Sequence, residues 1–257
     1  MKQSAEATQV FLEAVLSGDD AKAFRISQDI KFKGNSASTL WILHNNSSNN
    51  EADRPQAPAR YLNVIEGFFK TKSKSAMSAC LGDQVFIFTE NVAYPELDEG
   101  LEQELVSKFD FCDERLVVFN GLCSFEDIRR VAGFHDDFIY YACKIYPKKH
   151  VFFKHDLQFA AICKTIAASR KQLLFELLEP LRDDRNNDVL ARTLGIYLLD
   201  ADSNTQKAGD LMYQHKNTIQ YRLHVIRQKL NLDIKKMPAG FNLYLAAGIE
   251  RLIRNTV

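Results

Sequence analysis

Residues 198–233 read LLDADSNTQKAGDLMYQHKNTIQYRLHVIRQKLNLD and contain two short helical patterns joined by a tight connection. The first helix is expected at Thr205–Met212, because Ser203 followed three residues later by Gln206 has the pattern of a capping box. The second helix is expected at Asn217–Leu230, after a turn at Tyr213–His215. Two helices joined by three or four residues are typical of a helix-turn-helix, whose second helix enters the major groove of DNA.

The second helix has an apolar side and a polar side. The apolar residues at helical spacing are Ile219, Leu223, Ile226 and Leu230. The opposite side carries Asn217, Tyr221, His224 and Gln228, with Lys216, Gln220 and Arg227 on its flank. Amide side chains can hydrogen-bond to base edges, and Lys and Arg contact phosphates. Any amphipathic surface helix also has a polar side, so the DNA interpretation depends on the short turn, the cap and the local charge together.

Charge is distributed unevenly along the 257 residues. The whole chain has 33 Lys and Arg and 33 Asp and Glu, yet the part from Val189 onward holds ten basic and five acidic residues. That part therefore has a net charge of +5, and the rest has −5. A basic C-terminal part weakly indicates a polyanionic partner.

The helix-turn-helix residues resemble the signature of the PucR/CdaR family of bacterial transcription regulators. The residues that carry this resemblance are Ala208, Leu211, His215, Lys216, Asn217, Thr218, Tyr221, Arg222 and Leu223. Small Ala208 is expected where the second helix crosses the first. The resemblance covers about the last seventy residues and implies a DNA-binding regulator.

The upstream region is similar to the degenerate GGDEF-like domain of the same family. Residues 81–85, LGDQV, stand where GGDEF would stand, and Ser124–Ile128 resembles the following helix start. In this hairpin Leu81 replaces the first Gly and Gln84 replaces the Glu, which leaves Asp83 as its one carboxylate. One carboxylate cannot hold two metal ions, so we expect no catalytic residue, no bound metal and no cofactor.

The pattern of elements predicts an α+β chain. Strands are expected at 39–43, 77–80, 85–89, 116–119 and 151–153, alternating with helices, one of them broken near Gly133. From Asp156 onward the pattern is helical, with Ser169 as a possible break. The predicted parts are N-terminal helices (1–30), a GGDEF-like α/β domain (31–156), a helical linker (157–188) and a helix-turn-helix domain (189–257).

The leading hypothesis is a cytoplasmic, non-enzymatic transcription regulator that binds double-stranded DNA as a homodimer or higher oligomer, with an unknown small-molecule effector left open. The expected DNA-binding residues are His215, Lys216, Asn217, Thr218, Gln220, Tyr221, Arg222, His224 and Arg227. Arg222 could instead form a structural ion pair, and His215 could cap the helix.

Two alternatives belong to other classes of protein. In the first, the GGDEF-like domain binds a metabolite or nucleotide and DNA contact is secondary. In the second, the C-terminal helices bind a protein partner. No apolar run approaches the length of about 18–20 residues that a membrane helix needs, so no membrane partner is expected.

Overall fold

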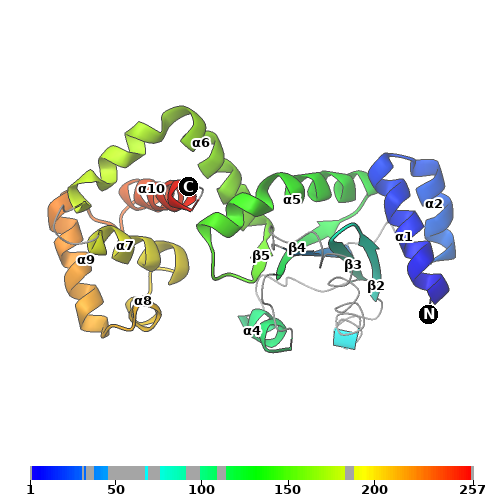
Figure 1. Cartoon of the computed structure of the whole chain (residues 1–257), viewed down its shortest axis with the longest axis horizontal. Coiled ribbons are helices and arrows are strands. Elements are labelled where there is room, and N and C mark those ends of the chain that lie inside the picture. Colours follow the sequence, from blue (N-terminus) through cyan, green and yellow to red (C-terminus); the bar gives the residue numbers. More distant parts are fainter. Residues whose placement is uncertain are drawn as a thin grey trace, which may run out of the picture. The chain divides into compact units, whose positions relative to one another are not determined.

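The computed structural model describes residues 2–30, 32, 38–45, 67–68, 76–90, 99–108, 114–182 and 188–255. The chain divides into two compact units, coloured along the sequence in Figure 1. Unit 1 comprises residues 1–137 and 149–157, and unit 2 comprises 138–148 and 158–257. Unit 1 holds the sheet and unit 2 is helical, which confirms the predicted α+β class. The four-part domain division stays a prediction.

The described strands of unit 1 form one sheet in the order β2-β3-β1-β4-β5. They are β1 (Ser38–Asn45), β2 (Ala76–Leu81), β3 (Gln84–Glu90), β4 (Glu114–Leu122) and β5 (Val151–Phe153). All neighbours pair antiparallel except β4 and β5, which are parallel. Gly82 and Asp83 make the predicted hairpin turn between the paired Leu81 and Gln84, and Gly82 has the positive φ of 60° that such a turn requires.

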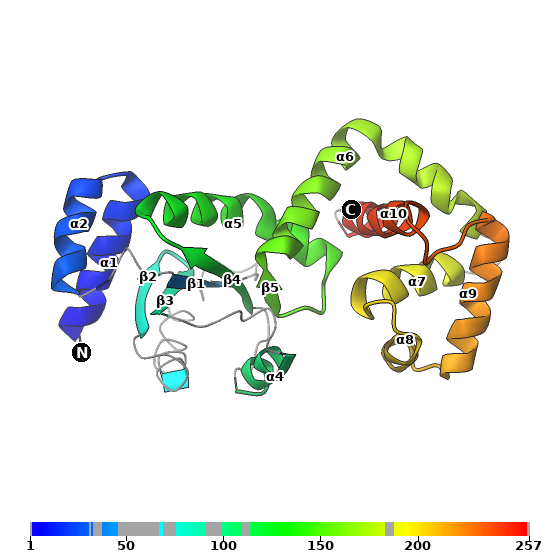
Figure 2. The same ribbon diagram turned by 180° about the vertical axis from the view of Figure 1, so that it is seen from behind.

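Helices α1 (Lys2–Ser17) and α2 (Asp20–Asp29) lie side by side next to β2 (Figure 2). The two helices are separated at Gly18, which has a φ of 82°, and α2 is capped by the Asp19 carboxylate, which accepts from the Lys22 amide at 3.0 Å. Phe11 of α1 packs edge-on against Phe88 of β3, with ring centroids 6.2 Å apart. Helix α1 therefore belongs to the core of unit 1, and α2 packs against α1.

Helix α5 (Phe125–Ile145) covers one face of the sheet, and helix α4 (Glu99–Lys108) follows β3 along the chain. The predicted break near Gly133 is wrong, because α5 is continuous there. A lone glycine costs a helix interior only about 1 kcal/mol relative to alanine. Burial of neighbours such as Val131, Ala132 and Ile139 outweighs that cost.

Unit 2 consists of helices packed around a second core. They are most of α6 (Lys154–Leu178), α7 (Val189–Gly195), α8 (Thr205–Met212), α9 (Lys216–Leu230) and α10 (Ala239–Arg254). A 3-10 turn at Glu179–Leu181 follows α6, and a π-helical turn at Ile196–Asp200 extends α7. Ser169 does not break α6, since its hydroxyl donates to the Thr165 carbonyl within one continuous helix.

Helix α10 approaches α6 closely at Gly248. A Cβ atom there would lie 2.7 Å from the Phe159 ring and 3.0 Å from Cys163 Sγ. Burial raises the pKa of the Cys163 thiol to about 12, so this sulfur is a neutral packing group. The Tyr146 and Tyr244 hydroxyls, 2.9 Å apart, join the end of α5 to α10.

No described helix is long and apolar enough to cross a membrane. No group of three or more described His, Cys, Asp or Glu side chains could hold a metal ion.

Candidate nucleic-acid interface

Helix α8 begins where predicted, but a different residue caps it. The Asn204 side chain accepts hydrogen bonds from the Gln206 and Lys207 amides at 2.8 and 3.2 Å. Ser203 has a φ of 60°, outside the extended range that an N-cap adopts, whereas Asn204 lies within it. The Gln206 side chain donates to Asp210 at 2.9 Å instead of reaching back to the cap. The expected capping box is therefore wrong.

The turn between the helices depends on two special backbone positions. Tyr213 ends α8 with a left-handed φ of 53°, and the Gln214 amide donates to the Gly209 carbonyl at 2.9 Å. A Cβ atom on Gly209 would lie 2.6 Å from the Gln214 carbonyl oxygen, so only glycine lets the turn pass this close. Sequence reasoning placed the small crossing residue at Ala208, which is fully buried in the core beside it. The signal in the sequence that could have identified this close approach is the glycine at position 209, within the first helix.

Helix α9 starts at Lys216, one residue earlier than expected. His215 is its N-cap, and His215 Nδ1 accepts from the Asn217 amide at 3.3 Å. Of the two roles predicted for His215, the structure shows the cap. This bond directs the imidazole toward the backbone of the first turn, where it helps set the direction in which α9 leaves the turn.

The two sides of α9 separate as predicted. Ile219, Leu223 and Ile226 are buried, and Leu230 is half-buried against the same core. The exposed residues of α9 are Lys216, Asn217, Gln220, Tyr221, His224, Gln228 and Lys229. Tyr221 is 68% exposed, which is high for an aromatic side chain and leaves its ring available to a partner. Thr218 is half-buried at the edge of this exposed face.

The two predicted arginines of α9 lie apart from the exposed face. Arg222 is half-buried and donates to the Thr193 hydroxyl of α7 at 3.4 Å. Among the described residues that hydroxyl is its partner, rather than the carboxylate of the suggested ion pair. Arg227 is half-buried, and its Nε has no hydrogen-bond partner in the described part of the chain.

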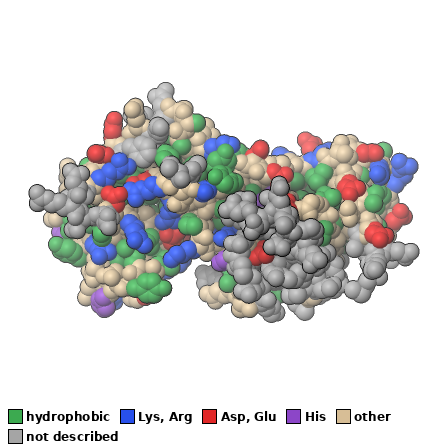
Figure 3. Space-filling view, in the orientation of Figure 1, with side chains coloured by type: hydrophobic (Ala, Val, Ile, Leu, Met, Phe, Trp, Pro, Cys, Tyr) green, Lys and Arg blue, Asp and Glu red, His purple; other side chains and the backbone are tan. Residues whose placement is uncertain are grey.

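Positive charge gathers on unit 2, where Lys and Arg side chains cluster over the part formed by α7–α10 (Figure 3). Sequence reasoning counted Arg192 of α7 in the regional charge but gave it no role, because its position relative to α9 is a tertiary feature. A basic surface with exposed polar groups attracts a polyanion such as nucleic acid more strongly than it attracts a neutral partner.

Two helices, a tight turn and an exposed second helix define a helix-turn-helix domain. Residues 190–249 match the family described as the PucR C-terminal helix-turn-helix domain. The resemblance noted in the sequence is thus confirmed for these residues, and the chain carries a PucR-type domain. The similarity of residues 31–156 to a GGDEF-like domain stays a prediction.

A solved structure of another protein is similar over most of the chain. It is the crystal structure of a regulator of polyketide synthase expression from Bifidobacterium adolescentis. The similarity covers 96% of this chain and 93% of that one, with 14% sequence identity and a TM-score of 0.43. No curated protein matches the chain.

Proposed function

We propose that this protein is a transcription regulator that binds specific DNA sequences by placing α9 in the major groove. The observation that carries the proposal is the exposed polar side of α9, held out from a buried apolar stripe by a helix-turn-helix turn. The match to the PucR helix-turn-helix domain supports the same class of function. In helix-turn-helix domains the second helix is the one that meets base pairs.

Within this proposal, residues at the start of α9 have different roles. Asn217, Thr218 and Tyr221 contact the edges of bases, since an amide can bond adenine bidentately and an aromatic ring can contact a thymine methyl group. Lys216 and Gln220 contact phosphates, as do Arg222 and Arg227 on the two flanks. Phosphate contacts set the register, and base contacts give the specificity.

The proposed active form is a homodimer or a higher oligomer. One short recognition helix reads only a few base pairs, so a single copy gains little specificity. Two copies about 34 Å apart would read two half-sites on one side of the duplex. The predicted operator is therefore a pair of related half-sites one helical turn apart.

The proposal is tested by selecting duplexes from a random pool with the full chain and measuring affinities by fluorescence anisotropy. Asn217→Ala should cost about 1–3 kcal/mol on the selected duplex and little on random duplexes. Lys216→Ala should weaken both and reduce the slope of log K against log salt by about one unit. Glu13→Gln in α1 is the matched surface control.

Two results would count against the proposal. An unchanged slope for Lys216→Ala would remove this residue from the interface. Absence of any duplex binding, together with salt-insensitive binding of a protein partner, would favour the alternative in which the helices bind protein.

A further inference from the structure

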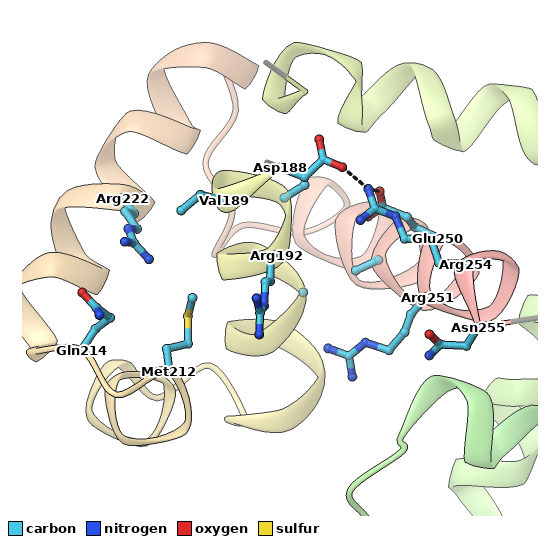
Figure 4. Close-up of a pocket in the computed structure, with 13 residues that line it drawn as sticks. Asp188, Val189, Arg192, Met212, Gln214, Arg222, Glu250, Arg251, Arg254 and Asn255 are labelled. Atoms are coloured by element: carbon cyan, nitrogen blue, oxygen red, sulfur yellow. Dashed lines mark hydrogen bonds and ion pairs between the residues drawn. The ribbon is translucent and has the colours of Figure 1, made fainter. Parts of the chain in front are cut away.

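A cavity of about 570 Å³ lies between α7, α9 and α10, within unit 2 (Figure 4). Among the described residues, the arginines that line it are Arg192, Arg222, Arg251 and Arg254. Gly195 leaves space in the wall of this cavity, because even a Cβ atom added there would lie 3.7 Å from its nearest neighbour, Arg251 Nη2. A volume of this size falls in the range of small-molecule sites, about 300–1,000 Å³.

Two of these arginines are neutralised by carboxylates. Arg251 donates to both oxygens of Asp200, at 2.7 and 2.8 Å, and also to the Ile145 carbonyl at 2.9 Å. Arg254 pairs with Asp188 and with Glu250, as the dashed lines in Figure 4 show. Partial burial opposes ionisation of Arg254, but the two acids outweigh it and raise its pKa. Both guanidinium groups are therefore held in fixed positions at the wall of the cavity by their carboxylate partners.

The other two arginines have no such compensation. Within the described ranges, the Arg222 side chain has only the Thr193 hydroxyl, 3.4 Å away, and the Arg192 side chain makes no hydrogen bond or ion pair. Arg192 and Arg222 come from different helices and point toward the same space in Figure 4. Like charges that share a cavity repel each other, so an anion between them would be stabilised by both.

We propose that this cavity binds a phosphate group, with Arg192 and Arg222 as its charged ligands. Guanidinium groups match the geometry of phosphate oxygens and can donate two hydrogen bonds each. Gln214, in the turn of the helix-turn-helix, lines the same cavity; its side-chain amide donates one hydrogen to the Tyr213 carbonyl at 3.1 Å and can offer the other as a neutral donor. The exposed polar side of α9 is left free, so this site is separate from the base-contacting surface.

The phosphate can come from either of two sources. One source is the DNA backbone. In that case this inference rests on the proposed function, and the phosphate contact holds α7 beside the major groove. The other source is a phosphorylated small molecule. Its binding would link α7 to α9 and so restrict the position of the recognition helix, α9. Both sources use the same two arginines.

The first experiment uses no DNA, so its result does not depend on the proposed function. Calorimetry of the full chain with sodium phosphate, against sodium chloride at equal ionic strength, should show saturable phosphate binding. Arg192→Gln should weaken it about tenfold, as expected for loss of a charge-assisted contact. Arg192 is exposed, and its side chain makes no hydrogen bond or ion pair within the described ranges, so we expect the variant to fold as the parent does. Lys229→Gln, exposed on α9 but outside the cavity lining, should bind phosphate as the parent does.

Two outcomes of this experiment overturn the proposal. One is no heat beyond that of chloride. The other is equal phosphate affinity in the parent and in Arg192→Gln, which would leave an adventitious ion only. Binding of malonate with none of phosphate would also overturn it, because the site would then select carboxylates.

The second experiment identifies the source. If the phosphate belongs to DNA, Arg192→Gln should reduce the salt slope of duplex binding by about one unit. If it belongs to a small molecule, the slope should stay unchanged while calorimetric phosphate binding is still weakened about tenfold. Failure of the parent chain to bind any duplex would remove the proposed function and leave the calorimetric result standing.

Discussion

At the residue scale, one amide side chain decides where α8 begins. Replacing Asn204 with alanine removes the acceptor for two backbone N–H groups, and we expect a loss of about 1 kcal/mol in the free energy of unfolding. Ser203→Ala is the matched control, with an expected change within about 0.5 kcal/mol. Urea unfolding followed by far-ultraviolet circular dichroism measures both. Equal losses in the two variants would show that the cap is shared.

The sequence could not separate these two caps. Ser203 and Asn204 are both good N-cap residues, and the S-x-x-Q pattern favours the first. The choice follows from the preceding π-helical turn, after which Asp202 and Ser203 both adopt positive φ. Asn204 is the first residue to return to extended backbone, so it takes the cap. Backbone path, rather than side-chain preference, decides the outcome.

A second residue-scale prediction concerns His44, at the end of β1 in unit 1. Its ring centroid lies 5.4 Å from that of His135, which is fully buried and 2.9 Å from Asp136. Burial, and then the charge of His135, lower the pKa of His44, although Asp83 and Asp136 oppose this shift. In the unfolded chain the His44 side chain has a pKa of about 6.5, so His44 binds a proton more readily in the unfolded chain than in the folded one.

The sign of the pH dependence follows from this difference in proton binding. The contribution of His44 to stability is complete above about pH 6.5 and is lost as the pH falls toward its lower folded pKa. His44→Phe should therefore flatten the decrease in unfolding free energy below about pH 6.5. Fluorescence of the chain's single tryptophan, Trp41, which is fully buried in β1, reports on unit 1. An unchanged pH dependence would show that another group titrates.

At the element scale, the same substitution should have opposite effects in two helices. Gly209→Ala places a Cβ atom 2.6 Å from the Gln214 carbonyl, so the turn must move, and we expect a loss of about 1–3 kcal/mol with weaker DNA binding. Gly133→Ala in α5 meets nothing within 4 Å and should stabilise the chain by about 0.5–1 kcal/mol. Thermal unfolding measures both, and stabilisation by Gly209→Ala would contradict the close turn.

Element positions were more predictable than the contacts that join them. The apolar stripe of α9 and the Gly82-Asp83 hairpin follow from local periodicity and turn chemistry, and both are present. The contacts of Arg222 and Arg227, which flank the apolar stripe, could not be predicted in this way. Each arginine turns toward a different neighbour, and which helix stands there is a property of the packed unit.

At the scale of the whole molecule, the core of unit 2 draws on residues far apart in the sequence. Leu178 and Leu181, before the polar run at 182–188, are buried in the same core as Ile219 of α9. Arg251 bonds to the Ile145 carbonyl, 106 residues away. Local patterns predict where helices lie, but they do not predict such distant partners. The predicted domain start at residue 189 therefore depends only on the polar sequence RDDRNND at residues 182–188 that precedes it.

These contacts predict the behaviour of two fragments. A fragment of residues 189–257 lacks Leu178 and Leu181, whose burial stabilises the core by about 1.5–3 kcal/mol each. It also lacks Tyr146, which pairs with Tyr244, and the Ile145 carbonyl that accepts from Arg251. It should therefore unfold at a clearly lower urea concentration than a fragment of residues 138–257, which keeps all of them. Urea titration by circular dichroism compares the two. Equal midpoints would mean that α7–α10 fold without the preceding helices, and that the helix-turn-helix domain begins at residue 189 in energetic terms as well.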